Sequence, residues 1–364
     1  MSGPVRHLYV HLPFCGHRCG YCDFVTVTGR ADQHGAYVDA LVRELELERS
    51  HLAARLETVF LGGGTPTLTE PAALARLLGA LPTADEVTVE ANPETIVPKV
   101  ARVLRDSGVT RVSLGAQSFR PHLLDVLERH ARPDAVRRAY YLLRGAGFDN
   151  ISLDLLYGIP GQSDADLASD LDDALALAPD HLSCYELEAK PGTRFTHAHG
   201  AELGRQGEAM EGYFAAVVEA LVGAGYRWYE TSNFCRPGRE ARHNLAYWLG
   251  RDYLGLGIGA VSTVAGRRWR TTPRLSAYLR ALAAGHRPDR DVEVLDRDTR
   301  LRERLMLGLR LDEPLPLADL DGALDPDALT RLERLGLLVR DGGGLALTER
   351  GRFLGGAVTA ELMA

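Results

Sequence analysis

The chain has 364 residues, of which 45% are hydrophobic and 25% charged, an ordinary composition for one large or two smaller globular domains. Its formal net charge of −7 and pI near 6.0 exclude a general electrostatic attraction to nucleic acids or anionic lipids. The longest apolar stretch, 214–225, contains Glu219 and is shorter than the ~20 residues that a membrane-spanning helix needs. No secretory segment precedes the first motif, so the sequence predicts a cytoplasmic protein.

The first feature in chain order is a group of three cysteines with the spacing C-x-x-x-C-x-x-C. The group consists of Cys15, Cys19 and Cys22. Three thiolates so close in sequence can hold three irons of a [4Fe–4S] cluster, which normally has four thiolate ligands. The position where a fourth cysteine might follow is Phe24, so one iron would be open to an external ligand. A zinc site completed by His11 or His17, and a disulfide, are the alternatives.

Short β-type runs then alternate with segments of helical periodicity as far as about residue 230. The six predicted strands cover 8–12, 59–61, 87–90, 111–114, 151–155 and 181–185. Apolar stripes of helical spacing lie between them, namely Tyr37, Leu41 and Leu45, and then Val136, Tyr140 and Leu143. Six consecutive βα units predict an α/β fold with a partial (βα)6 barrel. An open, doubly wound sheet is the alternative.

The predicted domain organisation has three parts. Residues 1–265 form the barrel domain, and 266–299, rich in Arg with scattered Pro and Asp, form a connector. Residues 300–364 combine helical segments with a hairpin turned by Gly342, Gly343 and Gly344, which resembles a winged-helix domain. Between 296 and 364 there are ten Arg or Lys against thirteen Asp or Glu, a net charge of −3 that disfavours a DNA-binding role.

Polar residues follow several predicted strands, where parallel barrels carry their functional groups. The glycine run 62–64 with Thr65 follows the second strand, and consecutive glycines let a ligand approach the backbone closely. Glu90 ends the third strand, Gln117 follows the fourth, and Asp154 ends the fifth. Since the carboxyl ends of the strands share one rim, these groups should face one site.

Several motifs together carry a resemblance to a known family. The cysteine spacing with Tyr21 before the third cysteine, and the run 62–66, resemble the radical S-adenosylmethionine (SAM) superfamily. Further motifs at 9–15, 62–67, 90–93, 115–119, 153–158 and 243–248 resemble the oxygen-independent coproporphyrinogen III oxidases and their relatives, the HemW-type heme chaperones. This resemblance spans nearly the whole chain.

The resemblance implies two resident cofactors. Cys15, Cys19 and Cys22 would bind a [4Fe–4S] cluster whose unique iron is chelated by SAM. The implied SAM site consists of Tyr9, Gly63, Gly64, Thr65, Glu90, Gln117, Arg129 and Asp154. At one of these positions the chain departs from the family, because Glu128 stands before Arg129 where the chaperones more often have Gly.

Two features favour the chaperone branch. The chain has Phe24 where the oxidases have a further cysteine, and it has the chaperone element H-N-x-x-Y-W. The heme-binding residues that this element implies are His243, Tyr247 and Trp248. Ala241 and Val261 stand where the chaperones commonly have Cys and His, and Cys235 is a nearby substitute ligand. The alternative is that His243 orients a loop and the two aromatic residues belong to the core.

The implied function is that of a heme chaperone, whose partners are heme and acceptor hemoproteins, as of a respiratory chain. No catalytic residue is assigned. A coproporphyrinogen III oxidase, a radical SAM methyltransferase or cyclopropanase, and a DNA-binding regulator are the competing interpretations.

Overall fold

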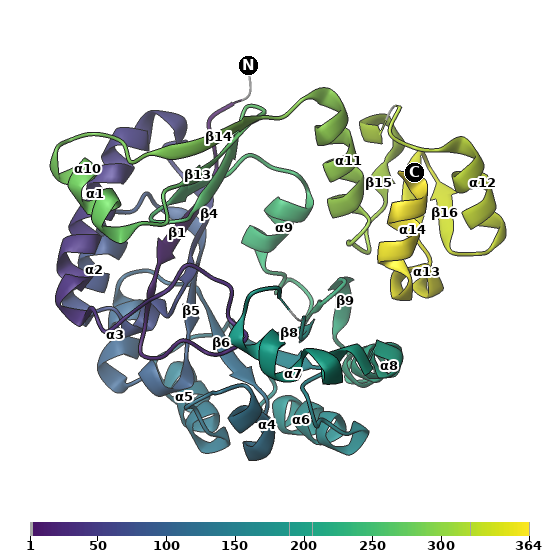
Figure 1. Ribbon diagram of the computed structural model, residues 1–364, viewed down its shortest axis with the longest axis horizontal. Helices are drawn as coiled ribbons and strands as arrows, with labels where there is room; N and C mark the ends of the chain where they lie inside the picture. The colour runs from purple at the N-terminus through teal and green to yellow at the C-terminus, as the bar shows by residue number, and fades with distance from the viewer. Residues whose placement is uncertain (1–2, 189, 206, 321, 364) are drawn as a thin grey trace.

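The computed structural model describes residues 3–188, 190–205, 207–320 and 322–363, and its centre is a nine-stranded sheet of order β11-β1-β4-β5-β6-β7-β8-β10-β9 (Figure 1). The six parallel strands are β1 His7–Leu12, β4 Leu56–Gly63, β5 Ala84–Ala91, β6 Arg111–Gln117, β7 Ile151–Tyr157 and β8 His181–Glu186. They neighbour one another in chain order with no reversal, whereas a doubly wound sheet reverses its order. The predicted partial (βα)6 barrel is confirmed.

Shorter strands extend both edges of this sheet. β11, Leu254–Leu256, is parallel to β1, while β10, Asn233–Cys235, and β9, Arg227–Glu230, continue antiparallel beyond β8. β2, Phe14–Cys15, pairs with β3, Val27–Thr28, and these two short strands flank the loop that carries the cysteines.

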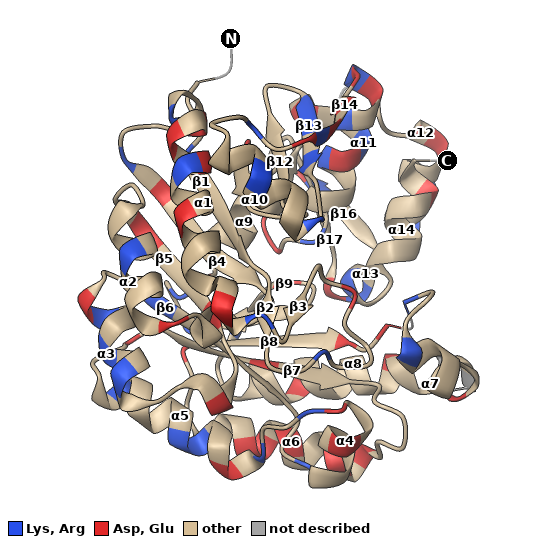
Figure 2. Ribbon diagram, turned by 60° about the vertical axis from the view of Figure 1, so that its left-hand side comes forward, with Lys and Arg blue, Asp and Glu red and all other residues tan. Residues whose placement is uncertain are grey.

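Helices cover the outer face of the sheet, and Figure 2 shows charged residues of both signs along them and few on the strands. The helices of the barrel are α1 His34–Glu48, α2 Pro71–Ala80, α3 Pro98–Asp106, α4 Pro121–Val126, α5 Pro133–Gly145, α6 Asp164–Ala176, α7 Arg194–Arg205 and α8 Gly207–Gly223. Both predicted apolar stripes are buried on α1 and α5. No helix in the described part of the chain is long and apolar enough to cross a membrane.

The two faces of the sheet differ in chemistry, because successive strand residues point to opposite sides. Apolar residues such as Val59, Val89 and Leu153 join the core beneath the helices. Buried polar residues alternate with them and hydrogen-bond across the strands, as His7 Nδ1 does to Thr58 Oγ1 at 2.9 Å. The inner face of the barrel is therefore polar.

The predicted connector carries regular structure. Within it, β13 Arg267–Thr271 and β14 Arg290–Val294 form an antiparallel sheet with β12, Val261–Val264, which precedes the connector, and α10, Leu275–Ala283, packs against α1. The buried Glu44 of α1 accepts hydrogen bonds from Tyr278 Oη at 2.7 Å and Gly257 N at 2.8 Å, and the buried Glu48 pairs with Arg287 and Arg290. These partners are more than 200 residues apart, which is why the local pattern looked like a linker.

The C-terminal segment forms a three-stranded sheet with helices around its own apolar cluster. Its elements are α11 Arg297–Gly308, β15 Leu315–Pro316, α12 Pro326–Arg334, β16 Leu338–Asp341, β17 Gly344–Leu347, α13 Glu349–Phe353 and α14 Gly355–Leu362. Gly342 and Gly343 adopt φ values of 56° and 85° in the hairpin turn, as the glycine run predicts. The segment contacts the barrel where the Arg352 guanidinium lies 3.6 Å from the Trp228 ring centroid. The domain division at 265 and 300 stays a prediction.

Candidate functional site

Of the three clustered cysteines, Cys15 ends β2, and Cys19 and Cys22 follow on the loop that leads to β3. All five thiols of the chain are free. Cys15 Sγ is 3.7 Å from Thr65 Oγ1, and Cys19 Sγ is 4.0 Å from Arg129 Nη1. Burial raises the pKa of the Cys15 thiol, and negative charge on Cys22 and Cys19 would raise it further. Half-buried thiols next to hydrogen-bond donors are a suitable ligand set for an iron–sulfur cluster.

The two alternatives for this loop, a disulfide and a zinc site, find no support. Among the described residues, no three His, Cys, Asp or Glu side chains are close enough to share one metal ion. Three thiolates that bind three different irons of a cluster need not lie as close together as three ligands of one metal ion. His11, one proposed zinc ligand, has both ring nitrogens occupied, one by Tyr9 Oη at 3.0 Å and the other by the Val25 carbonyl oxygen at 2.8 Å.

A chain of polar side chains joins the cysteine loop to the strand ends. Asn92 Nδ2 donates to Thr65 Oγ1 at 3.0 Å, and Arg129 Nη2 donates to Asn92 Oδ1 at 3.0 Å and to the Gly115 carbonyl at 2.9 Å. The structure therefore brings Thr65 and Arg129 to the loop, as expected. Asn92 was missed by the sequence reasoning, although it belongs to the Glu90–Pro93 motif and follows a predicted strand.

The glycine run at the end of β4 packs closely against the backbone of the residues that precede the cysteine loop. Gly63 has φ of 112°, and its N–H donates to Glu90 Oε2 at 3.0 Å. The N–H of Gly64 donates to the Leu12 carbonyl at 2.8 Å, and a Cβ at Gly64 would lie 2.6 Å from the backbone of Pro13. Both amides thus have hydrogen-bond partners inside the protein. A side chain at Gly64 is excluded by the backbone of Pro13 and Phe14, the residues just before Cys15.

Two half-buried carboxyl groups, Glu90 and Asp154, lie at the predicted rim. Burial is the main cause that raises the pKa of both, to about 7 for Glu90, and the nearby Arg111 guanidinium counteracts it. Asp154 accepts from Ser113 Oγ at 3.1 Å. Gln117 follows in a left-handed conformation with φ of 67°, an unusual backbone state that often marks functional sites.

Arg111 is a further residue that the sequence reasoning missed. It is 1% exposed, and its Nε and Nη2 atoms have no hydrogen-bond partner in the described part of the protein. A buried guanidinium with free donors suits an anionic group inside the barrel. The sequence could have indicated this role, because Arg111 is the first residue of a predicted strand and the alternation of side chains along that strand places it on the polar face.

The helix α9, Arg242–Trp248, lies against the inner side of the sheet and carries the expected heme residues (Figure 1). His243 is 1% exposed, and its Nδ1 and Nε2 atoms contact Thr58 Oγ1 at 2.7 Å and Tyr247 Oη at 2.9 Å. Burial lowers the pKa of this imidazole to about 3. Cys235, the substitute ligand, is fully buried, and burial raises the pKa of its thiol to about 12. Both axial-ligand candidates are therefore enclosed, and this geometry fits the orienting role for His243.

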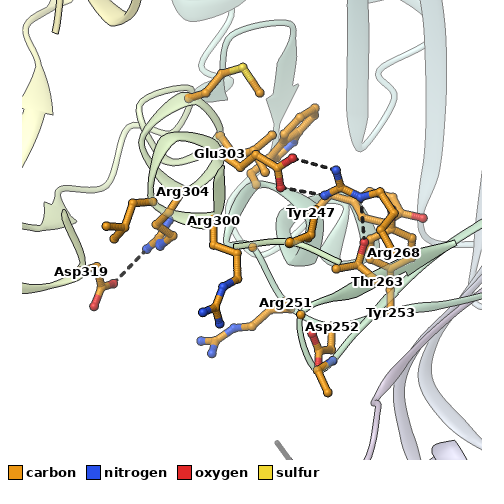
Figure 3. Close-up of a pocket in the computed structure, with 18 of the residues that line it drawn as sticks. Tyr247, Arg251, Asp252, Tyr253, Thr263, Arg268, Arg300, Glu303, Arg304 and Asp319 are labelled. Atoms are coloured by element: carbon orange, nitrogen blue, oxygen red, sulfur yellow. Dashed lines mark hydrogen bonds and ion pairs between the residues drawn. The ribbon is translucent and has the colours of Figure 1, made fainter. Parts of the chain in front are cut away.

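Tyr247 and Trp248 instead line a cavity of about 1090 Å³ between the barrel and α11 (Figure 3). Trp248 also packs under the Arg310 guanidinium, 4.5 Å from its ring centroid. A smaller cavity of about 280 Å³ adjoins the cysteine loop at Tyr9 and Phe24. Tyr247 and Tyr253 line both cavities, with ring centroids 4.6 Å apart.

The chain matches two family models. The model of the radical SAM superfamily matches residues 9–174, which include the cysteine loop and the first five strands of the barrel. The model of the HemN C-terminal domain matches residues 295–354.

Similar proteins with curated names match along the whole chain. The heme chaperone HemW of Mycobacterium tuberculosis (strain H37Rv) is 39% identical over 376 residues, covering 100% of this chain and 96% of the relative. The HemW of Bacillus subtilis (strain 168) is 32% identical, with 97% and 98% covered, and that of Escherichia coli K12 is 36% identical, with 81% and 80% covered. Among solved structures, the coproporphyrinogen III oxidase HemN of Escherichia coli superposes with a TM-score of 0.84, covering 99% of this chain and 90% of that chain at 24% identity. That likeness shows the fold alone.

Proposed function

Because the chain belongs to the family of HemW heme chaperones, we propose that it binds heme and delivers it to acceptor hemoproteins. The observation that carries this proposal is the 39% identity to a chaperone over the full length of the chain. Acceptors of a respiratory chain and a cytoplasmic location are part of the proposal.

Membership of the radical SAM superfamily implies a [4Fe–4S] cluster and SAM, which supply one-electron chemistry when bound. We propose that Cys15, Cys19 and Cys22 hold the cluster. The hydroxyl of Thr65 and the guanidinium of Arg129 support this assignment, because each lies beside one of the three sulfurs.

The proposed SAM site is the polar rim above the inner face of the barrel. Its residues are Tyr9, Gly63, Gly64, Thr65, Glu90, Gln117, Arg129 and Asp154. Glu90 and Asp154 offer half-buried carboxyl groups as hydrogen-bond partners for the positively charged and hydroxyl-bearing parts of the ligand. Gly64 contributes by fixing the position of the cysteine loop, since its own amide is already paired.

For heme, we propose Tyr247 and Trp248 as packing residues, because both line the large cavity. His243 is proposed as a positioning residue that holds the Tyr247 hydroxyl at 2.9 Å. This assignment differs from the axial-ligand role that the family motif implies.

The experiment combines two measurements on anaerobically reconstituted protein. Titration with heme should give a saturable absorption band of bound heme, and incubation with coproporphyrinogen III, SAM and a reductant should give no protoporphyrinogen. Robust conversion of coproporphyrinogen III would replace the chaperone assignment by that of an oxidase. Absence of saturable heme binding would overturn the proposal altogether.

A further inference from the structure

The large cavity lies outside the barrel, at the junction with the C-terminal segment. Its walls come from the end of α9 and the following loop, from β12 and β13, and from α11. At about 1090 Å³ it is slightly larger than the ~300–1,000 Å³ that ligand pockets usually have. The space is therefore large enough for a flat ligand of many atoms.

One part of the wall is apolar and aromatic. Tyr247, Trp248 and Tyr253 contribute rings, and Leu295, Leu301 and Leu307 contribute aliphatic side chains. Aromatic rings bury large areas against a flat π-system and fix its orientation through offset or edge contacts. This wall suits the face of a conjugated macrocycle.

The polar part of the wall has an excess of positive charge, with five arginines against three acidic residues. Each acid already has a partner. Glu303 forms a bidentate pair with Arg268 at 2.7 Å, Asp319 lies 3.4 Å from Arg304, and Asp252 accepts the Ala265 N–H at 2.9 Å. Glu303 and Asp319 are thus paired with arginines, whereas Asp252 keeps its negative charge, and the lining as a whole has a formal excess of two positive charges.

Arg251 and Arg300 form no ion pair within the described part of the chain. Arg300 Nε donates only to the Asp296 carbonyl at 3.3 Å, and both side chains are exposed. Both residues line the same cavity, and Figure 3 shows that Arg268 and Arg304 turn toward Glu303 and Asp319 whereas Arg251 and Arg300 do not. Guanidinium groups without an ion-pair partner can bind carboxylates strongly through charge-assisted, bidentate hydrogen bonds.

We propose that this cavity holds the heme, with its two propionates on Arg251 and Arg300 and its macrocycle against the wall of Tyr247, Trp248 and Tyr253. The assignment rests on the proposed function and adds the location and the recognised groups. Arg251 belongs to the barrel and Arg300 to α11, so the carboxylate site needs both parts of the chain.

The described lining has neither His nor Cys, and the groups in it that can bind iron are carboxylates, tyrosine hydroxyls and the Met306 thioether. Met306 is 47% exposed on α11, so its thioether is accessible to a ligand in the cavity. Recognition through carboxylates and packing, without a strong imidazole or thiolate bond to iron, suits a protein that must release heme to an acceptor.

The experiment compares heme with heme dimethyl ester, in which the propionates are neutral, on the cluster-loaded full chain at low salt. The test variant is R251Q/R300Q, and the matched control is R102Q/R138Q, which removes two exposed arginines from α3 and α5. The test variant should bind heme about a hundredfold more weakly than wild type, roughly tenfold for each charge-assisted contact. The control should bind as wild type does.

The ester separates carboxylate recognition from general weakening. Wild type should bind heme more tightly than the ester, by about the same factor as the loss of heme affinity in the test variant. The test variant should bind the two ligands with equal affinity. Equal heme affinity in the test variant and the control, or an ester that binds wild type as tightly as heme, would overturn the proposed site. In either case saturable binding of heme to wild type would leave the proposed function intact, whereas its absence would refute the function itself.

Discussion

The replacement His243→Ala tests whether this residue is a buried structural group or an iron ligand. The imidazole stacks on Phe60 with ring centroids 5.2 Å apart and joins Thr58 to Tyr247 by hydrogen bonds. Loss of two hydrogen bonds at about 1 kcal/mol each, with a partly collapsed cavity, should destabilise the protein by about 3 kcal/mol at pH 7.

The pH dependence makes this prediction specific. Burial lowers the pKa of His243 from 6.5 to about 3, so the folded state excludes a proton that the unfolded state binds below pH 6.5. The stability that depends on the neutral imidazole is therefore fully present above pH 6.5 and is lost as the pH falls toward 3. At 1.36 kcal/mol per unit, about 2 kcal/mol of it disappears between pH 7 and pH 5.

Urea unfolding of cluster-free protein, followed by circular dichroism at pH 7 and pH 5, measures this effect. The deficit of His243→Ala relative to wild type should shrink from about 3 to about 1 kcal/mol, because the variant lacks the titrating group. His122→Ala, at an exposed position on α4, serves as the control and should cost less than about 0.5 kcal/mol. A deficit that is equal at both pH values would refute the argument from burial. A displaced absorption band in the heme-bound variant would show that His243 binds the iron.

Three further outcomes are expected. Cys19→Ser should lose the cluster after anaerobic reconstitution, whereas Cys184→Ala, in the core under the helices, should keep its iron and sulfide. A full iron content in Cys19→Ser would contradict the ligand assignment. Gly64→Val should lower both the cluster content and the SAM affinity, because a Cβ at this position would lie 2.6 Å from the backbone of Pro13. A normal iron content with reduced SAM binding would show instead that the glycine contacts SAM. Burial raises the pKa of Glu44 to about 7, so wild-type stability should fall as the pH rises from 4.5 to 7, and Glu44→Gln should remove about 3 kcal/mol of that decline in urea unfolding. An equal decline in the variant would exclude Glu44 as its source.

Local sequence patterns were sufficient for the barrel strands, for the helices that cover them and for the hairpin near the C-terminus. Alternation such as that of Val87, Thr88, Val89 and Glu90 is imposed by the strand geometry itself, so it is visible without the rest of the fold. The cysteine spacing and the glycine run likewise reflect local requirements for thiolates in one loop and for the close approach of Gly64 to Pro13.

Only the tertiary structure decided which polar residues meet, because their partners are far apart in the chain. Asn92 became a site candidate because it accepts a hydrogen bond from Arg129, and Arg111 because two of its buried donor atoms have no partner in the described part of the protein. Neither observation can be read from the spacing of residues in the sequence. The connector folded because Glu44 and Glu48 bind residues more than 200 positions away. In the same way, His243 looked like a free ligand in the sequence, but the burial of its ring between Thr58 and Tyr247 depends on how α9 packs inside the barrel. Sequence thus fixes the local chemistry of each element, while desolvation and long-range pairing determine which groups remain available to a ligand.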